Sequence, residues 1–141
     1  MKHKLLLSFF MAFIPIVMMA YDCYVDEIYY DLDTSNETAQ VTSEPHYEGD
    51  VCLTYSGNIN IPSSFVYDGI TYTVTSIGEY AFADCSNLTS VIIPSSVTSI
   101  EDWAFNGCSG LTSIEIPSSV TNIGQSAFEF CSSLISIAIP K

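Results

Sequence analysis

VTSIEDWAFNGCSGLTSIEIPSS, residues 97–119, is a phrase that the chain repeats before and after it. Residues 74–96 and 120–141 keep its frame, V-T-x-I-x-x-x-A-F-x-x-C-S-x-L-x-S-x-x-I-P, without gaps, and the last copy is one residue shorter. A fixed period of about 20–50 residues is typical of proteins in which each copy is one structural unit that stacks on the next. The sequence therefore predicts a repeat solenoid.

Within one unit, the spacing L-x-x-I-x-I predicts a short strand. Ile114 and Ile116 alternate with Ser113 and Glu115, so the isoleucines share one face and the polar side chains share the other. Pro117 follows directly, and it ends the strand because it has no N–H to donate to a neighbour. Each unit is expected to contribute one such strand, with its isoleucines in the core.

Stacking is required because a single unit cannot bury its own apolar face. In a stack, each isoleucine and phenylalanine lies on its counterpart from the next unit, and the strands run parallel at about 4.8 Å. The Ala-Phe pair is too short for a full helix, so we expect one short helical or 3₁₀ turn around residues 125–128. The expected fold is a stack of short parallel strands with little helix.

A partial unit precedes the three full ones. Its phrase GNINIPSSF, residues 57–65, matches the later I-x-I-P-S-S-V motif, with nine additional residues before the next unit begins. The insertion, at residues 63–73, contains Asp68-Gly69 between two β-prone runs, and this dipeptide favours a two-residue type I′ turn. We expect a hairpin there. Residues 57–141 are thus assigned to the repeats, as a partial first unit and the units 74–96, 97–119 and 120–141.

Residues 21–56, which precede the repeats, differ from them in composition. They hold nine of the sixteen acidic residues, and β-prone runs occur at 24–25, 28–32 and 51–55. We predict that this acidic segment forms a small β-rich cap on the first unit. At the opposite end the sequence stops at Lys141 directly after a strand, and we expect an open apolar edge there.

Residues 1–20 have the pattern of a secretory signal peptide. Lys2 and Lys4 precede an apolar run over residues 5–19, and Ala20 offers a small residue for cleavage. The run, about fifteen residues broken by Pro15, is shorter than the ~20 that a membrane-spanning helix needs. We therefore expect export, cleavage after Ala20 and no stable membrane span in the mature protein.

Cleavage would leave sixteen acidic side chains and one basic one, Lys141, because the sequence has no arginine. Such a surface repels phosphate backbones and anionic lipids, which are bound through lysine and arginine. Nucleic acid is therefore excluded as a partner. The acidity either keeps a Ser- and Thr-rich secreted protein soluble or attracts cationic partners or calcium.

Catalytic residues are not indicated. His46, the only histidine after residue 20, lies in the loop-like stretch SEPHYEG with no serine or cysteine motif beside it. The carboxylates of Glu101 and Asp102 are adjacent in sequence and are expected to point apart, which does not suit acid/base catalysis. We expect no enzyme activity and no cofactor.

The five cysteines invite a metal or disulfide interpretation. Cys85, Cys108 and Cys131 recur every 23 residues, which places their thiols in a row and not around a tetrahedral metal, so we expect buried structural thiols. Cys23 and Cys52 of the cap either pair in an oxidising compartment or stay free. The run DLDTS at 31–35 is similar to part of a calcium loop but lacks its glycine and closing glutamate, so no metal site is expected.

The motif L-x-x-I-x-I-P-x-x-V-x-x-I-x-x-x-A-F-x-x-C resembles that of the BspA-like leucine-rich repeat family of surface proteins. One instance consists of Leu88, Val91, Ile93, Pro94, Val97, Ile100, Ala104, Phe105 and Cys108. The resemblance covers residues 57–141 closely, and the segment from Tyr21 resembles the leader domain common in such proteins. It implies a right-handed leucine-rich-repeat solenoid, display at or beyond the cell surface, adhesion to host or matrix proteins, and no catalytic residue.

The outward face of the parallel strands is the remaining candidate for function, because solenoids of this class bind partners on such a face. Its side chains are small or polar apart from one isoleucine. They are Asn58, Asn60, Ser90, Ile92, Ser113, Glu115, Ser136 and Ala138. We expect a non-enzymatic, secreted or surface-displayed module that binds an extracellular protein or glycan there. Two alternatives stay open: a solvated face without a ligand, and an assembly unit or repeat fragment that oligomerises through its open edge.

Overall fold

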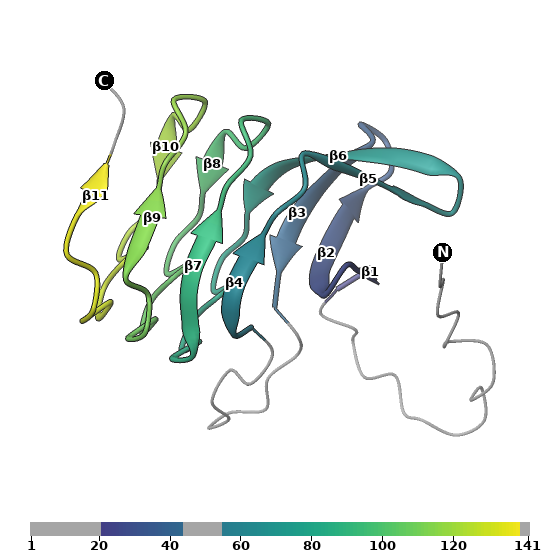
Figure 1. Cartoon of the computed structure of the whole chain (residues 1–141). Helices are drawn as coiled ribbons and strands as arrows, with labels where there is room; N and C mark the ends of the chain where they lie inside the picture. The colour runs from purple at the N-terminus through teal and green to yellow at the C-terminus, as the bar shows by residue number, and fades with distance from the viewer. Residues whose placement is uncertain (1–20, 44–54, 139–141) are drawn as a thin grey trace.

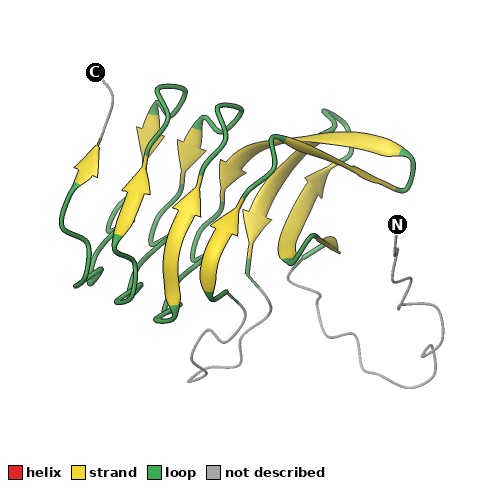
Figure 2. Cartoon of the chain, in the orientation of Figure 1, coloured by secondary structure: helices red, strands yellow, loops and turns green. Residues whose placement is uncertain are grey.

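A computed structural model describes residues 21–43 and 55–138. This part of the chain consists of strands and turns without a helix, as Figure 2 shows. The strands are β1 (Cys23–Val25), β2 (Ile28–Asp33), β3 (Thr38–Thr42), β4 (Gly57–Asn60), β5 (Ser64–Tyr67), β6 (Ile70–Ile77), β7 (Leu88–Ile92), β8 (Ser99–Ile100), β9 (Ser113–Glu115), β10 (Asn122–Ile123) and β11 (Ile137–Ala138).

The strands form two sheets on opposite sides of a stack (Figure 1). One sheet has the order β11-β9-β7-β4, and all of its pairs are parallel. The other runs β1-β2-β3-β6-β8-β10, with β5 paired to β6. Each repeat gives one strand to each sheet, so a repeat is one rung of the stack. The predicted solenoid of short parallel strands is confirmed.

Residue alternation within a strand separates core from surface. In β9, Ile114 is buried between the exposed Ser113 and Glu115, as the spacing predicts. Ile114 pairs with Val91 of β7 on one side and with Ile137 of β11 on the other, so apolar residues lie on apolar residues along the stack. The second strands of the second and third rungs, β8 and β10, were not expected, because two residues are too few to produce a visible period.

The corner that contains the Ala-Phe pair is not helical. The prediction of a helical or 3₁₀ turn around residues 125–128 is wrong, because these residues form non-helical turns. Ser126 has a φ of 53°, as have its counterparts Tyr80 (56°) and Trp103 (52°), and a left-handed residue interrupts a right-handed helix. The corner is held between rungs instead: the Trp103 N–H donates to the Gln125 carbonyl at 2.9 Å.

A ladder of aromatic rings runs through the core. Phe82 and Phe105 stack with ring centroids 4.9 Å apart, and Phe105 and Phe128 stack at 5.2 Å, with planes within 5° in both pairs. Tyr55 extends this ladder at its N-terminal end, 4.6 Å from Phe82. Equivalent residues of successive rungs therefore make contact, as the stacking argument predicts.

The N-terminal cap joins the stack through β3. This strand pairs antiparallel with β2 and parallel with β6 of the first rung. Tyr55 adds a second connection, because its hydroxyl donates to the Thr42 carbonyl at 2.8 Å and accepts from the Tyr29 N–H at 3.0 Å. The expected β-rich cap is present. Strand β3 was not predicted, and of the β-prone run at 51–55 only Tyr55, which lies outside any strand, is described.

The hairpin expected from Asp68-Gly69 is also present. Strands β5 and β6 pair antiparallel up to Tyr67 and Ile70, and the turn between them has positive φ at Asp68 (52°) and Gly69 (82°). A type I′ turn requires positive φ at both central residues. The hairpin extends from the first rung beyond the cap (Figure 1).

Candidate interaction surface

The exposed side of the β4–β7–β9–β11 sheet, called here the strand face, carries two rows of side chains. The first row consists of Asn58, Ser90 and Ser113, with Ser136 just before β11, and the second of Asn60, Ile92, Glu115 and Ala138. Seven of these eight side chains are exposed, and Ser90 is half-buried. Although they come from four separate segments, the structure brings the predicted residues together on one face.

The chemistry of the strand face is mostly polar. Asn58 Oδ1 accepts hydrogen bonds from Ser90 Oγ at 2.7 Å and from Thr89 Oγ1 at 2.9 Å, so the first row is partly satisfied by its own members. Ile92 lies in register between Asn60 and Glu115, and 63% of its surface is exposed. The second row thus offers an apolar contact beside a carboxylate.

The cysteines differ from expectation at two positions. Cys85 is disulfide-bonded, so the prediction that it is a free structural thiol, like Cys108 and Cys131, is wrong. Cys23 is a buried free thiol, so the pairing of Cys23 with Cys52 is not formed, and Cys52 itself lies outside the described residues. Cys108 and Cys131 are free, as expected for structural thiols.

Two of the three free thiols, Cys23 and Cys108, have raised pKa values and stay protonated, whereas a hydrogen bond with Cys108 lowers the pKa of Cys131. Cys108 Sγ donates to the Phe82 carbonyl at 3.0 Å. Its interaction with the Cys131 thiol, together with burial, raises the pKa of Cys108 well above the ordinary value. Burial, with a smaller effect of Asp22, raises the pKa of Cys23 to about 11. Since the thiolate is the nucleophile and the metal ligand, neither group suits catalysis at neutral pH.

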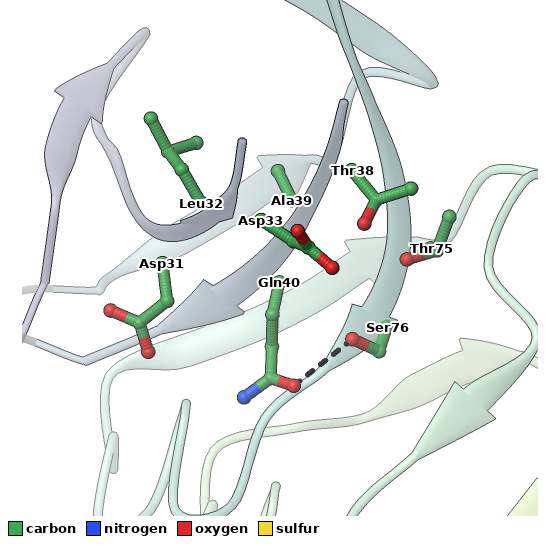
Figure 3. Close-up of a pocket in the computed structure, with 8 residues that line it drawn as sticks. All are labelled: Asp31, Leu32, Asp33, Thr38, Ala39, Gln40, Thr75 and Ser76. Carbon is green, nitrogen blue, oxygen red and sulfur yellow. Dashed lines mark hydrogen bonds between the residues drawn. The ribbon is translucent and has the colours of Figure 1, made fainter. Parts of the chain in front are cut away.

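A shallow hollow lies where β2, β3 and β6 meet (Figure 3). Its lining residues are Asp31, Leu32, Asp33, Thr38, Ala39, Gln40, Thr75 and Ser76. Across it, Ser76 Oγ donates to Gln40 Oε1 at 3.1 Å, which ties β6 to β3. Burial, followed by the charge of Asp22, raises the pKa of the Asp31 carboxyl.

The second carboxylate of the hollow, Asp33, forms hydrogen bonds within the turn that begins at this residue. It accepts hydrogen bonds from the Ser35 hydroxyl and N–H and from the side chain and N–H of Asn36. These bonds lower the pKa of Asp33 to about 2. Because both carboxylate oxygens are engaged in the turn, the run Asp31-x-Asp33-x-Ser35 is explained by local turn chemistry and not by a calcium loop.

Among residues 21–43 and 55–138, no three His, Cys, Asp or Glu side chains gather as a metal site. The same ranges contain no helix with the length and apolar character needed to cross a membrane. His46 and the expected signal peptide, residues 1–20, lie outside the described residues.

One surface feature, a pair of stacked aromatic rings outside the core, was not predicted from the sequence. Tyr80 and Trp103 occupy the same position of successive rungs, and their ring centroids lie 5.2 Å apart with planes 3° from parallel. The signal was present in the sequence, because these aromatic residues are 23 apart, but the repeat frame marks this position as variable.

Comparison with known proteins agrees with this architecture. The family model of the BspA type leucine rich repeat region matches residues 63–141. The chain belongs to the BspA-type leucine-rich repeat family. This family membership confirms the resemblance in the repeat motif, and it identifies the chain as a leucine-rich repeat protein, a type of protein-interaction module.

Solved structures of bacterial leucine-rich repeat proteins are similar to this BspA-type chain. A leucine-rich repeat protein from Bacteroides ovatus is 37% identical, with a TM-score of 0.73 over 85% of this chain and 30% of that one. A leucine rich cell surface protein from Faecalibacterium prausnitzii is 30% identical, with a TM-score of 0.65 over 82% and 29%. The leucine rich repeat protein of T. pallidum is 29% identical, with a TM-score of 0.67 over 84% and 50%.

The BspA-type chain is much shorter than the first two of these proteins, since it spans 30% and 29% of their lengths. A search of curated proteins found no match. The comparisons thus establish the family and the fold, and the strand face is the feature of this chain that bears on its binding partner.

Proposed function

We propose that this chain is a non-enzymatic interaction module, secreted or displayed at the cell surface, that binds an extracellular protein or glycan through its strand face. The observation that carries the proposal is the alignment of two solvent-exposed rows on one parallel sheet. Solenoids bind partners on such extended faces. A relative of known structure, the Faecalibacterium prausnitzii protein, is a cell surface protein, which supports the proposed location.

The second row of the strand face is proposed to supply the affinity. Ile92 is exposed yet apolar, so covering it with a partner removes apolar surface from water. Glu115 stands beside it in register and fixes the orientation of a polar or charged group of the partner. The small residues around them, such as Ser113 and Ala138, let a partner approach the sheet closely.

A binding screen against host matrix proteins and glycans identifies the partner, and a double variant tests the face. Ile92→Asp combined with Glu115→Lys is expected to abolish binding in a pull-down while the circular dichroism spectrum stays unchanged. The matched control is Thr121→Asp combined with Asn122→Lys, two exposed positions on or beside β10 of the other sheet, which should keep binding. Full binding by the strand-face variant would refute the proposal.

Self-association through the third rung is a second candidate, because two large apolar side chains protrude from that rung. Phe130 is 71% exposed and Ile135 is 92% exposed. The corresponding residues of the second rung are Gly107 and Thr112, so the repeat frame itself does not require apolar residues there. Covering such exposed apolar side chains with another protein surface removes apolar area from water.

Light scattering over a range of concentrations tests this second candidate. The unaltered chain is expected to gain mass as concentration rises, and Phe130→Gly combined with Ile135→Thr, which installs the second-rung residues, is expected to remain monomeric. A monomeric profile for the unaltered chain at every concentration would rule out self-association.

A further inference from the structure

The stacked pair Tyr80 and Trp103 occupies a position where the backbone disfavours large side chains. The φ values of Tyr80, Trp103 and Ser126 are 56°, 52° and 53°, so every rung adopts the left-handed conformation here. For residues with a Cβ this conformation is strained, and glycine or asparagine would fit at lower cost. The rung geometry therefore gives no reason for tyrosine and tryptophan at this position.

Burial does not explain these rings either. Two residues further along each rung, Phe82 and Phe105 are fully buried in the core ladder, whereas Tyr80 is 47% exposed and Trp103 is half-buried. The outer pair is therefore a surface column that runs alongside the core ladder.

The column has a third position, and Ser126 occupies it. Ser126 follows Trp103 by one repeat, and the Trp103 N–H donates to the Gln125 carbonyl, which fixes the third rung directly beside the indole. One face of the indole is covered by Tyr80. The opposite face is directed toward a side chain of only two heavy atoms, so a planar group of a partner can stack there in line with the two rings.

The charges around the column favour a cation. Glu79 and Asp102 directly precede the two rings in sequence, and Asp102 Oδ1 accepts a hydrogen bond from the Gln125 N–H at 2.6 Å, which holds this carboxylate against the third rung, one residue before Ser126. Within residues 21–43 and 55–138 there is no lysine, arginine or histidine, so no described basic side chain competes for the site.

We propose that the indole face of Trp103, together with the carboxylate of Asp102, binds the guanidinium group of an arginine from a basic segment of a partner protein. Arginine fits because its guanidinium is planar, stacks on aromatic faces and pairs with carboxylates. Tryptophan gives the strongest cation–π attraction among the aromatic residues. This column site is distinct from the strand face, so the chain has two surfaces of different chemistry.

The single tryptophan of the chain makes the column site directly measurable. A short oligo-arginine peptide is expected to change the fluorescence of Trp103 saturably at physiological salt, and the matched oligo-citrulline peptide, which is uncharged, is expected to have no effect. With a labelled peptide, anisotropy measures affinity for variants that lack the indole. Trp103→Leu should lower the affinity about tenfold, in line with a cation–π contribution of about 1–2 kcal/mol.

A filled-site variant separates stacking from general attraction to an acidic surface. Ser126→Tyr, compatible with left-handed backbone because Tyr80 adopts it, places a ring on the indole face and should lower affinity for oligo-arginine about as much as Trp103→Leu. Ser126→Gly is the matched control and should bind like the unaltered chain. Circular dichroism verifies that each variant is folded.

Three results would overturn the proposal. The first is equal oligo-arginine affinity for the unaltered chain, Trp103→Leu and Ser126→Tyr, which would reduce the effect to net charge. The second is equal binding of oligo-citrulline. The third is a neutral oligosaccharide that changes Trp103 fluorescence when oligo-arginine does not, which would make the column a sugar platform. Retained oligo-arginine binding by the Ile92→Asp, Glu115→Lys variant would show that the column site is independent of the strand face.

Discussion

The second and third rungs have the same repeat frame and yet differ in burial. In the second rung Val97, Ile100, Phe105 and Leu111 have no exposed surface. Their counterparts in the third rung, Val120, Ile123, Phe128 and Leu134, are only half-buried. The second rung has a described neighbour on both sides, whereas the third has one on one side only.

The difference teaches that burial in this protein is a property of the stack and not of the repeat phrase. A rung contributes one layer of apolar side chains, and each layer is covered by the layers before and after it. At the N-terminal side this covering is provided by β3 and by Tyr55, neither of which belongs to a complete repeat. Identical residues are therefore expected to contribute unequally to stability.

The largest predicted effect compares two phenylalanines of the core ladder. Phe105→Ala should destabilise the chain by about 3–5 kcal/mol, because it opens a cavity between two stacked rings. Phe128→Ala should cost about 1–2 kcal/mol, because a half-buried ring loses only part of its transfer free energy and leaves no closed cavity. Urea unfolding of both variants measures the difference, and equal losses would show that the position in the stack does not matter.

A smaller effect is predicted at the other end of the ladder. Tyr55→Phe keeps the ring against Phe82 but removes the hydroxyl that bonds to Thr42 and Tyr29. The Thr42 carbonyl and the Tyr29 N–H each lose a hydrogen bond at this buried site, so we expect a loss of about 1–3 kcal/mol in urea unfolding. No loss would mean that the covering of the first rung depends on ring contact alone.

The smallest effect is predicted for a purely local interaction, the Asp33 turn. Hydrogen bonds from Ser35 and Asn36 lower the pKa of Asp33 to about 2. The turn therefore adds stability above the ordinary aspartate pKa of about 3.9, and this contribution is lost as pH falls toward 2. Asp33→Asn lacks this contribution, so between these pH values its melting temperature should fall less than that of the unaltered chain. An unchanged pH profile would contradict this assignment.

Much of the fold was predictable because the repeat makes its own periods visible. The alternation Ser113-Ile114-Glu115-Ile116 and the closing Pro117 specify the strand, and Asp68-Gly69 specifies the hairpin. The eight strand-face positions followed from the same alternation. These features depend on neighbours in sequence, so local sequence patterns were enough to derive them.

Features that depend on neighbours in space were missed. The sequence places an Ala-Phe pair after Ser126, which suggested a helical turn, but Ser126 is left-handed, and the carbonyls on either side of it, of Gln125 and Ala127, accept from the preceding rung. The disulfide state of Cys85 and the stacking of Tyr80 on Trp103 likewise arise only when distant segments meet. Strand β3 was not predicted; it pairs with the neighbouring β2 and also with β6, which lies more than thirty residues away.

Amide hydrogen exchange tests the dependence on neighbouring rungs most directly, because it compares equivalent residues in the unaltered chain. The Phe105 N–H donates to the Ala127 carbonyl of the next rung at 2.8 Å, whereas no described residue accepts from the Phe128 N–H. We predict that the Phe105 amide exchanges only on global unfolding and that the Phe128 amide exchanges orders of magnitude faster. Equal protection of the two amides would contradict this account of the stack.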